Sequence, residues 1–173
     1  MADGTLKILL SSSETAQADE WEAMLVDIGD LASRLTRLLN PVAQRKGKNL
    51  TAFIEDGVPK IQGDSDELIQ LLWNITQNAI THAHGNIEMA VVRADDAAIT
   101  VTLKDDGDGI DPEILPRIFE WGVSGGEGRS GIGLSICRDI ARKHGGDISV
   151  QSEPGSGTCV SVTLKRKTED FDE

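Results

Sequence analysis

Residues 99–110, Ile-Thr-Val-Thr-Leu-Lys-Asp-Asp-Gly-Asp-Gly-Ile, contain the transition that decides the fold. Apolar and polar residues alternate over the first part of this stretch, which predicts a strand with one buried face. The strand runs directly into an acidic, glycine-bearing loop, where the backbone can approach a flat ligand closely. A carboxylate held at the end of a strand can accept a hydrogen bond from an amine. We therefore expect the first loop residue, Asp105, to be a binding residue.

Acidic loops also occur in calcium sites, but the spacing here argues against that interpretation. A calcium-binding loop needs a bidentate Glu at its twelfth position. Counted from Asp105, that position is occupied by Pro116, which has no side-chain ligand. The loop is therefore interpreted either as a site for a base with an exocyclic amine, such as adenine, or as a plain acidic turn.

Helices and strand pairs alternate on both sides of this loop. Asp27 is a suitable N-cap for a helix that Gly47 terminates, and Asp64 or Ser65 begins a second helix. This order is typical of an α+β two-layer sandwich, in which a mixed, mostly antiparallel sheet is covered on one face by three helices. The predicted strands are 24–26, 50–54, 59–61, 86–93, 97–104, 147–151 and 158–164, the long helices are 28–45, 64–85 and 131–144, and a short helix begins at Asp111-Pro112.

Composition limits the possible functions. The chain has 173 residues, 39% of them hydrophobic, and a formal net charge of −12. The acidic balance argues against binding to nucleic acid or to anionic lipid, because both require a basic surface. The sequence has no apolar run of the ~20 residues that span a membrane and no secretory segment at its start, so we expect a cytoplasmic location. Cys137 and Cys159 fit neither a disulfide framework nor a zinc site and are expected to be reduced thiols.

Two asparagines in the second helix form a further candidate site. Asn74 and Asn78 are four residues apart and therefore share one face of the helix. An amide oxygen is a suitable ligand for Mg²⁺, which takes its other ligands from water and phosphates. The alternative is that both residues lie on the solvated face of an amphipathic helix.

Glycines are concentrated in the region after the acidic loop. Eight of the 18 glycines fall between residues 107 and 133, and we expect no regular structure over 122–130. The segment then enters a helix, whose free N-terminal amides and dipole favour phosphate oxygens. Arg129 and Ser130 can add hydrogen-bond donors there. The pattern is neither a Walker motif nor a dinucleotide-binding fingerprint.

Taken in order, the asparagine helix, the acidic loop, the glycine-rich segment and the final hairpin resemble the catalytic, ATP-binding domain of sensor histidine kinases. These domains belong to the Bergerat-fold superfamily with gyrase, the mismatch-repair ATPases and the heat-shock chaperone ATPases. The resemblance covers roughly residues 24–165 and implies binding of ATP and Mg²⁺, with 122–130 as the ATP lid. The residues it implicates are Asn78 for Mg²⁺, Asn74 beside the phosphates, Asp105 for the adenine amine, Gly107 and Gly109 along the base, Ile110 and Leu134 as pocket walls, Arg129, Ser130, Gly131 and Gly133 around the second glycine box, and Thr158, whose hydroxyl helps to hold Asp105.

The resemblance also implies partners. Members of the family transfer the γ-phosphoryl group to a histidine on a separate dimerisation hairpin, and a response regulator acts downstream. His82, His84 and His144 lack the motif that surrounds such a histidine, and His144 is expected to be a cationic helix terminus. The predicted organisation is a helical stub and linker from the hairpin at 1–23, the ATP-binding domain at 24–166 and a charged, disordered tail at 167–173.

Two positions depart from the family pattern. The second glycine box usually begins with a glycine, and this chain has Arg129 there. Three residues after Asn78, where the family often has Lys or Arg near the phosphates, this chain has Thr81. Arg129 or His82 can supply the missing charge. Two other functions stay open: an anti-sigma-type serine kinase with the same fold, and a non-catalytic module controlled by nucleotide, which Thr81 and the short lid favour.

Overall fold

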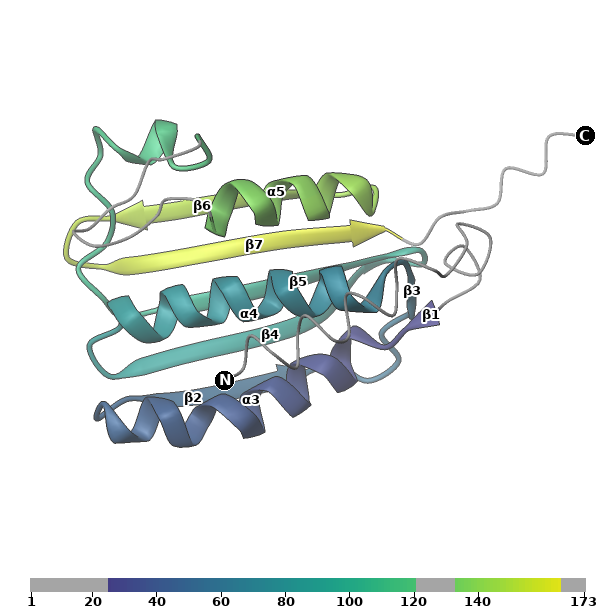
Figure 1. Cartoon of the computed structure of the whole chain (residues 1–173), viewed down its shortest axis with the longest axis horizontal. Coiled ribbons are helices and arrows are strands. Elements are labelled where there is room, and N and C mark those ends of the chain that lie inside the picture. Colours follow the sequence, from purple (N-terminus) through teal and green to yellow (C-terminus); the bar gives the residue numbers. More distant parts are fainter. Residues whose placement is uncertain (1–24, 121–132, 166–173) are drawn as a thin grey trace, which may run out of the picture.

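The computed structural model describes residues 25–120 and 133–165. Figure 1 shows two layers, a five-stranded sheet and three described helices that cover one of its faces. The helices are α3 (Ile28–Arg45), α4 (Ser65–His82) and α5 (Gly133–Lys143), with a short 3-10 helix η1 (Leu115–Arg117). The strands are β1 (Leu25–Val26), β2 (Asn49–Ile54), β3 (Ile61–Gln62), β4 (Asn86–Asp95), β5 (Ala98–Asp105), β6 (Asp147–Glu153) and β7 (Gly157–Lys165). The predicted α+β two-layer sandwich is confirmed.

Several predictions fall outside the described residues. They are the stub and linker at 1–23, the lid at 122–130, the tail at 167–173 and the binding residues Arg129, Ser130 and Gly131. Among the helices that are described, none is both long and apolar enough to cross a membrane.

The main sheet is mixed, as the sequence predicts, with the strand order β2-β4-β5-β7-β6. β2 and β4 are parallel, and all other neighbours are antiparallel. A parallel pair requires a long crossover, which β3 and α4 provide. β1 and β3 form a small antiparallel sheet of their own, with Val26 opposite Ile61. The two strands on either side of the Asp56-Gly57 turn therefore pair with other strands and not with each other.

The core lies between the sheet and α4, the middle helix of the layer. Alternate residues of β4 and β5 point toward the helices, and those residues are at most 1% exposed: Ile87, Met89, Val91, Ile99, Val101 and Leu103. The opposing residues of α4, Leu68, Leu71, Leu72 and Ile75, are buried to the same extent. Burying one such side chain is worth roughly 1.5–3 kcal/mol. This packing fixes α4 relative to the ends of β4 and β5.

Side-chain caps set the helix boundaries. Asp27 Oδ1 accepts the Asp30 N–H at 2.9 Å, which confirms the first cap. Asp64 caps α4, since its Oδ1 accepts the Asp66 and Glu67 N–H groups at 2.9 and 3.3 Å. α4 ends at His82, earlier than the predicted end near residue 85, because Ala83 adopts an extended backbone with ψ 145°. The Lys48 ammonium donates to the Ile80 carbonyl at this end at 2.6 Å.

His144 corrects a prediction. It is 4% exposed, and its Nε2 accepts the Asp64 N–H at 3.1 Å. Its Nδ1 lies 2.7 Å from the Ile140 carbonyl oxygen, which can only accept. Because one ring nitrogen accepts while the other donates, the ring is the neutral tautomer and not the expected cationic terminus. His144 instead joins the end of α5 to the start of α4.

The segment after the acidic loop is less helical than predicted. Asp111 Oδ1 accepts the Glu113 N–H at 2.9 Å and so caps a turn, as its position suggests. Helical geometry is limited to η1, which begins only at Leu115. The two cysteines are free thiols, as expected, and Cys137 is buried.

Candidate functional site

One end of the sandwich brings together the segments that carry the predicted binding residues. In Figure 1, β5 and α4 finish at this end, α5 begins there, and the turn between β6 and β7 closes it. Asp105 is the last residue of β5, and Asn78 lies four residues before the last residue of α4. The two residues on which the predicted site depends therefore lie at the same end of the domain.

Asp105 is a buried carboxylate, with the residue 6% exposed. Its Oδ1 accepts the Gly107 N–H at 2.9 Å. Burial raises the pKa of Asp105, and the Gly107 N–H, the His82 charge and the Thr158 backbone N–H only partly oppose this effect. A carboxylate offers about four acceptor positions, so the side chain retains capacity for a ligand's donor. Asp105 is thus a buried hydrogen-bond acceptor, and its protonation depends on burial and on the neighbouring donors.

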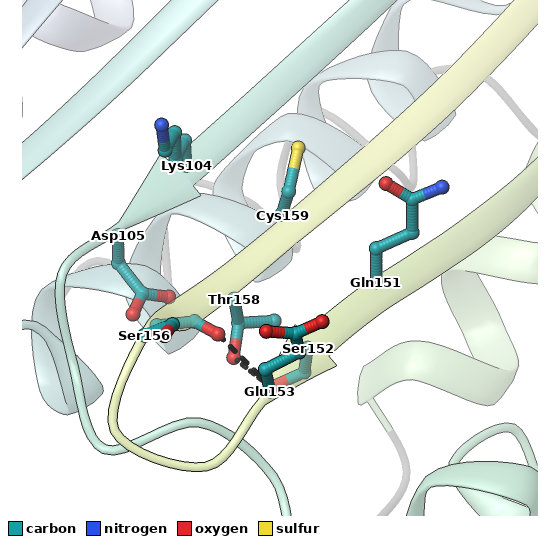
Figure 2. A pocket seen from close by; sticks show the side chains of 9 residues that line it. Lys104, Asp105, Gln151, Ser152, Glu153, Ser156, Thr158 and Cys159 are labelled. Atoms are coloured by element: carbon teal, nitrogen blue, oxygen red, sulfur yellow. Dashed lines mark hydrogen bonds between the residues drawn. The ribbon is translucent and has the colours of Figure 1, made fainter.

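Two hydroxyl groups support the loop from the side of β6 and β7 (Figure 2). The Ser152 hydroxyl accepts the Ile110 N–H at 2.7 Å and lies 3.0 Å from the Thr158 hydroxyl oxygen. It also donates to the Gly157 carbonyl at 3.0 Å. The Thr158 hydroxyl therefore contacts Ser152, while the Thr158 backbone faces Asp105. Ser152 was not predicted as a site residue, although its position opposite Thr158 in the final hairpin is a usable signal.

A hollow of about 210 Å³ opens beside Asp105 and is lined by residues of β5, β6 and β7, among them Lys104, Ser152, Thr158 and Cys159 (Figure 2). Ligand pockets usually enclose ~300–1,000 Å³. The hollow is smaller than that range, so by itself it does not hold a nucleotide.

The two glycines of the acidic loop are required by the protein's own backbone. A Cβ on Gly107 would overlap the His82 carbonyl oxygen at the end of α4. Gly109 has a φ of 79°, and a Cβ there would overlap the Glu153 carbonyl oxygen. The loop therefore contacts both α4 and the β6–β7 turn so closely that side chains are excluded. The close approach of a base to these glycines stays a prediction.

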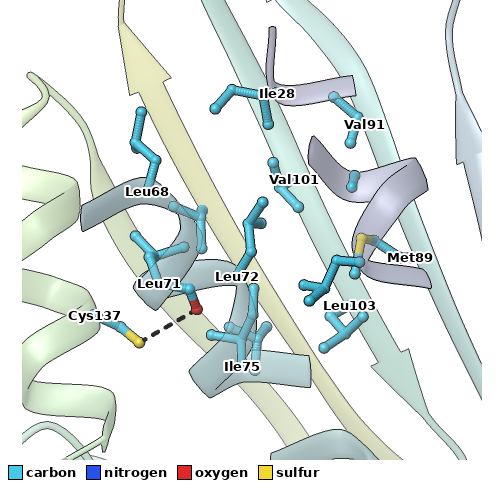
Figure 3. Packing of buried hydrophobic residues seen from close by; sticks show 14 of the residues in the cluster. Ile28, Leu68, Leu71, Leu72, Ile75, Met89, Val91, Val101, Leu103 and Cys137 are labelled. Atoms are coloured by element: carbon cyan, nitrogen blue, oxygen red, sulfur yellow. Dashed lines mark hydrogen bonds between the residues drawn. The ribbon is translucent and has the colours of Figure 1, made fainter. Parts of the chain in front are cut away.

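The two asparagines have different surroundings. The Asn74 side chain hydrogen-bonds the buried Cys137 thiol of α5, whose pKa is raised to about 12 mainly by burial. Figure 3 shows the same thiol close to the Leu71 carbonyl, at the junction of α4 and α5. Asn78 lies one turn farther along α4, roughly 6 Å along the helix axis toward the end of the helix. The structure thus ties Asn74 to α5 and places Asn78 nearer to the end of α4.

The start of α5 is open among the described residues. A Cβ on Gly133 would have no described atom within 4 Å, so described packing does not require a glycine there. Leu134, the predicted pocket wall, is partly buried and packs against the core.

Sequence comparison identifies the family. Residues 63–168 match the family described as histidine kinase-, DNA gyrase B-, and HSP90-like ATPases. The chain belongs to this family. The match includes every residue that the sequence predicts as part of the site, from Asn74 to Thr158.

The relatives of this ATPase domain include sensor kinases. The chain is 36% identical over 127 residues to the adaptive-response sensory kinase SasA of Thermosynechococcus vestitus (strain NIES-2133 / IAM M-273 / BP-1), which covers 70% of this chain and 33% of the relative. It is 29% identical over 175 residues to the sensor histidine kinase ZraS of Klebsiella oxytoca, which covers 99% of this chain and 38% of the relative. The chain therefore spans about a third to two-fifths of these relatives.

Solved structures agree. Full-length ShkA in complex with AMPPNP superposes with a TM-score of 0.74 at 27% identity, over 82% of this chain and 30% of that one. The mycobacterial sensor histidine kinase MprB gives a TM-score of 0.70 at 24% identity, over 84% of this chain and 99% of that one, a likeness of fold. The predicted resemblance to the ATP-binding catalytic domain of sensor histidine kinases is confirmed.

Proposed function

We propose that this ATPase domain binds Mg²⁺-ATP at the Asp105 end of the sandwich and donates the γ-phosphoryl group to a histidine on a separate helical hairpin. The observation that carries the proposal is the buried Asp105 carboxylate at the end of β5, beside the end of the helix that holds Asn78. Since ATP is available inside the cell, the proposed location is cytoplasmic.

The Asp105 carboxylate is suited to the adenine amine. A hydrogen bond to a charged group is worth roughly 1.5–3 kcal/mol, and a buried acceptor left without a donor is penalised. A base that presents a carbonyl oxygen at the same position would face the carboxylate with a like partial charge. Asp105 therefore favours adenine over a 6-oxo purine, with Gly107, Gly109, Ile110 and Leu134 proposed as the surrounding walls.

The triphosphate must point away from the acidic loop. Two unit charges 4 Å apart interact by about 4 kcal/mol at an effective dielectric constant of 20, and Asp105, Asp106 and Asp108 are neighbours in sequence. The proposed phosphate site is toward Asn78 and the start of α5, where Gly133, with Arg129, Ser130 and Gly131, would supply amides and one positive charge.

A magnesium ion fits this donor set. Within residues 25–120 and 133–165, no three His, Cys, Asp or Glu side chains gather into a metal-binding group. A metal held here is proposed to take one amide oxygen from Asn78 and its other ligands from phosphates and water, as Mg²⁺ does in nucleotide sites. When bound, it would neutralise the phosphate charge that develops during transfer.

The proposed transfer breaks the bond between the γ-phosphorus and the β,γ-bridging oxygen and forms a bond from phosphorus to an imidazole nitrogen. ADP leaves, and the imidazole proton passes to a base beside the accepting histidine. His144 is unsuited to the accepting role, since both ring nitrogens are bonded inside the fold. His82 and His84 lack the motif that surrounds an accepting histidine, so the accepting hairpin is proposed to be a partner, with a response regulator downstream.

Calorimetry with ATP and ADP, with and without Mg²⁺, tests the binding step, and no detectable binding with Mg²⁺ present would overturn the proposal. Radiolabelled ATP with a histidine hairpin or a serine-bearing antagonist protein tests transfer. Acid-labile label on the hairpin supports the histidine kinase. Acid-stable label on the antagonist indicates a serine kinase of the anti-sigma type. Tight binding without transfer to either indicates a non-catalytic nucleotide-gated module.

A further inference from the structure

The Asp106 carboxylate accepts four hydrogen bonds from residues 84–86. Its Oδ1 accepts the His84 and Gly85 N–H groups, each at 2.9 Å. Its Oδ2 accepts the Asn86 N–H at 3.0 Å and the Asn86 side-chain amide at 3.4 Å. Three consecutive backbone N–H groups thus converge on one carboxylate. We call this arrangement the Asp106 clamp.

The clamp joins the two elements that carry the proposed site. His84 and Gly85 belong to the short connection that follows α4, and Asn86 is the first residue of β4. Asp106 follows Asp105 directly, and its own N–H donates to the Asn86 carbonyl at 3.3 Å. On its other side, Gly107 lies against the last carbonyl of α4, where a Cβ would not fit. The end of α4 and the loop after β5 are therefore fixed to one another through residue 106.

The clamp also separates the charges of the acidic loop. Asp106 is directed to the α4–β4 connection, and Asp108 is paired there with His84, with Oδ1 2.8 Å from Nε2. Only Asp105 among the three is buried. The loop therefore presents one carboxylate to the proposed base site and directs the other two to the protein's own donors.

We propose that Asp106 is a positioning residue for base recognition: it holds the loop so that Asp105 meets the adenine amine while α4 holds Asn78 at the phosphate end. The inference rests on the proposed function, because it assigns a role relative to ATP. Asp106 itself touches no nucleotide atom in this proposal. Loss of the Asp106 carboxylate would displace Asp105 and reduce the preference for adenine over a 6-oxo purine.

The test compares affinities for ATP and inosine triphosphate, which carries an oxygen in place of the 6-amine. The dissociation constant of inosine triphosphate divided by that of ATP reports the placement of Asp105. A general loss of stability weakens the binding of both nucleotides equally and leaves this ratio unchanged. We expect Asp106→Ala to lower the ratio about tenfold, since it depends on the geometry of one charged hydrogen bond. Asp96→Asn is the matched control, because Asp96 is fully exposed in the β4–β5 turn and pairs only loosely with Arg93, at 3.7 Å.

Asp106→Asn provides a second variant if the alanine variant does not fold. The amide keeps one acceptor for His84 and Gly85 but places a donor opposite the Asn86 N–H, so we expect a ratio between those of wild type and Asp106→Ala. Wild-type ratios in both variants, with only a lower melting temperature, would overturn the positioning role and leave the proposed function intact. Failure of the wild-type chain to prefer ATP would overturn the positioning role together with the assignment of Asp105 to the adenine amine.

Discussion

Replacing Asp105 with Asn is expected to weaken ATP binding and, at the same time, to stabilise the nucleotide-free domain. The carboxylate is 6% exposed, and burial is the main cause of its raised pKa. Asn keeps an oxygen for the Gly107 N–H but removes the buried charge. The ligand loses a charged acceptor worth roughly 1–3 kcal/mol, which corresponds to about a 5- to 150-fold rise in the dissociation constant.

The sign of the stability effect follows from the direction of the shift. A carboxyl group whose pKa is raised by folding binds protons more tightly in the folded state. The stability that it contributes is therefore present below the unfolded value of 3.8 and is lost as the pH rises through the raised folded value. At neutral pH the ionised group opposes folding, and its replacement by Asn removes that cost. ATP affinity has the opposite dependence and falls on acidification through the raised pKa.

Calorimetry with Mg²⁺-ATP and thermal melting of the nucleotide-free chain check the two effects together, with Asp96→Asn as the control. A variant that binds ATP within twofold of wild type would refute the assignment of Asp105 to the base. A variant that loses affinity and also melts at a lower temperature without nucleotide would refute the argument from buried charge.

Three further expectations can be measured separately. Asn78→Ala should remove the Mg²⁺-dependent part of ATP affinity, about tenfold or ~1.4 kcal/mol, and equal losses with a chelator present would contradict the metal role. Gly63→Ala should cost about 1–3 kcal/mol in urea unfolding, because a Cβ there would overlap the His144 ring; an unchanged midpoint would show that the ring can move. The pKa of Asp106 is lowered from 3.8 to about 2 by the Gly85 and Asn86 N–H groups first of all. The stability from the clamp should therefore be present above pH 3.8 and be lost as the pH falls toward 2. If the NMR shifts of the Gly85 and Asn86 amides titrate only near pH 4, the lowered pKa of Asp106 is contradicted.

Local patterns predicted the elements because each depends on neighbouring residues. The alternation before Asp105 describes a strand that buries one face, and β5 has that burial pattern. The cap at Asp27 and the spacing of apolar residues in α4 likewise depend on residues three or four apart. Such local patterns do not show which strands pair with each other. The Asp56-Gly57 turn predicts a change of direction, whereas the partners of β2 and β3 are decided by distant strands.

The same limit applies to polar side chains. Sequence motifs identified Asp105, Asn78 and Thr158 as candidates, but neither Ser152 nor Asp106 was singled out. Their hydrogen bonds join residues up to 42 positions apart. His144 was misinterpreted for the same reason, because its neutral state depends on the Asp64 N–H, 80 positions away.

The sequence by itself determined the kind of elements, their order and the family of the chain, because propensity, capping and motif spacing act over a few residues. Only the tertiary structure decided that Asp105 is the buried residue of the acidic loop and that Asp106 is bonded to the protein's own N–H groups. It also decided the hydrogen-bond partners of His144. Charge and hydrogen-bond capacity belong to the side chain, but the solvent and the donors around it are set by segments that meet only when the sheet and helices pack.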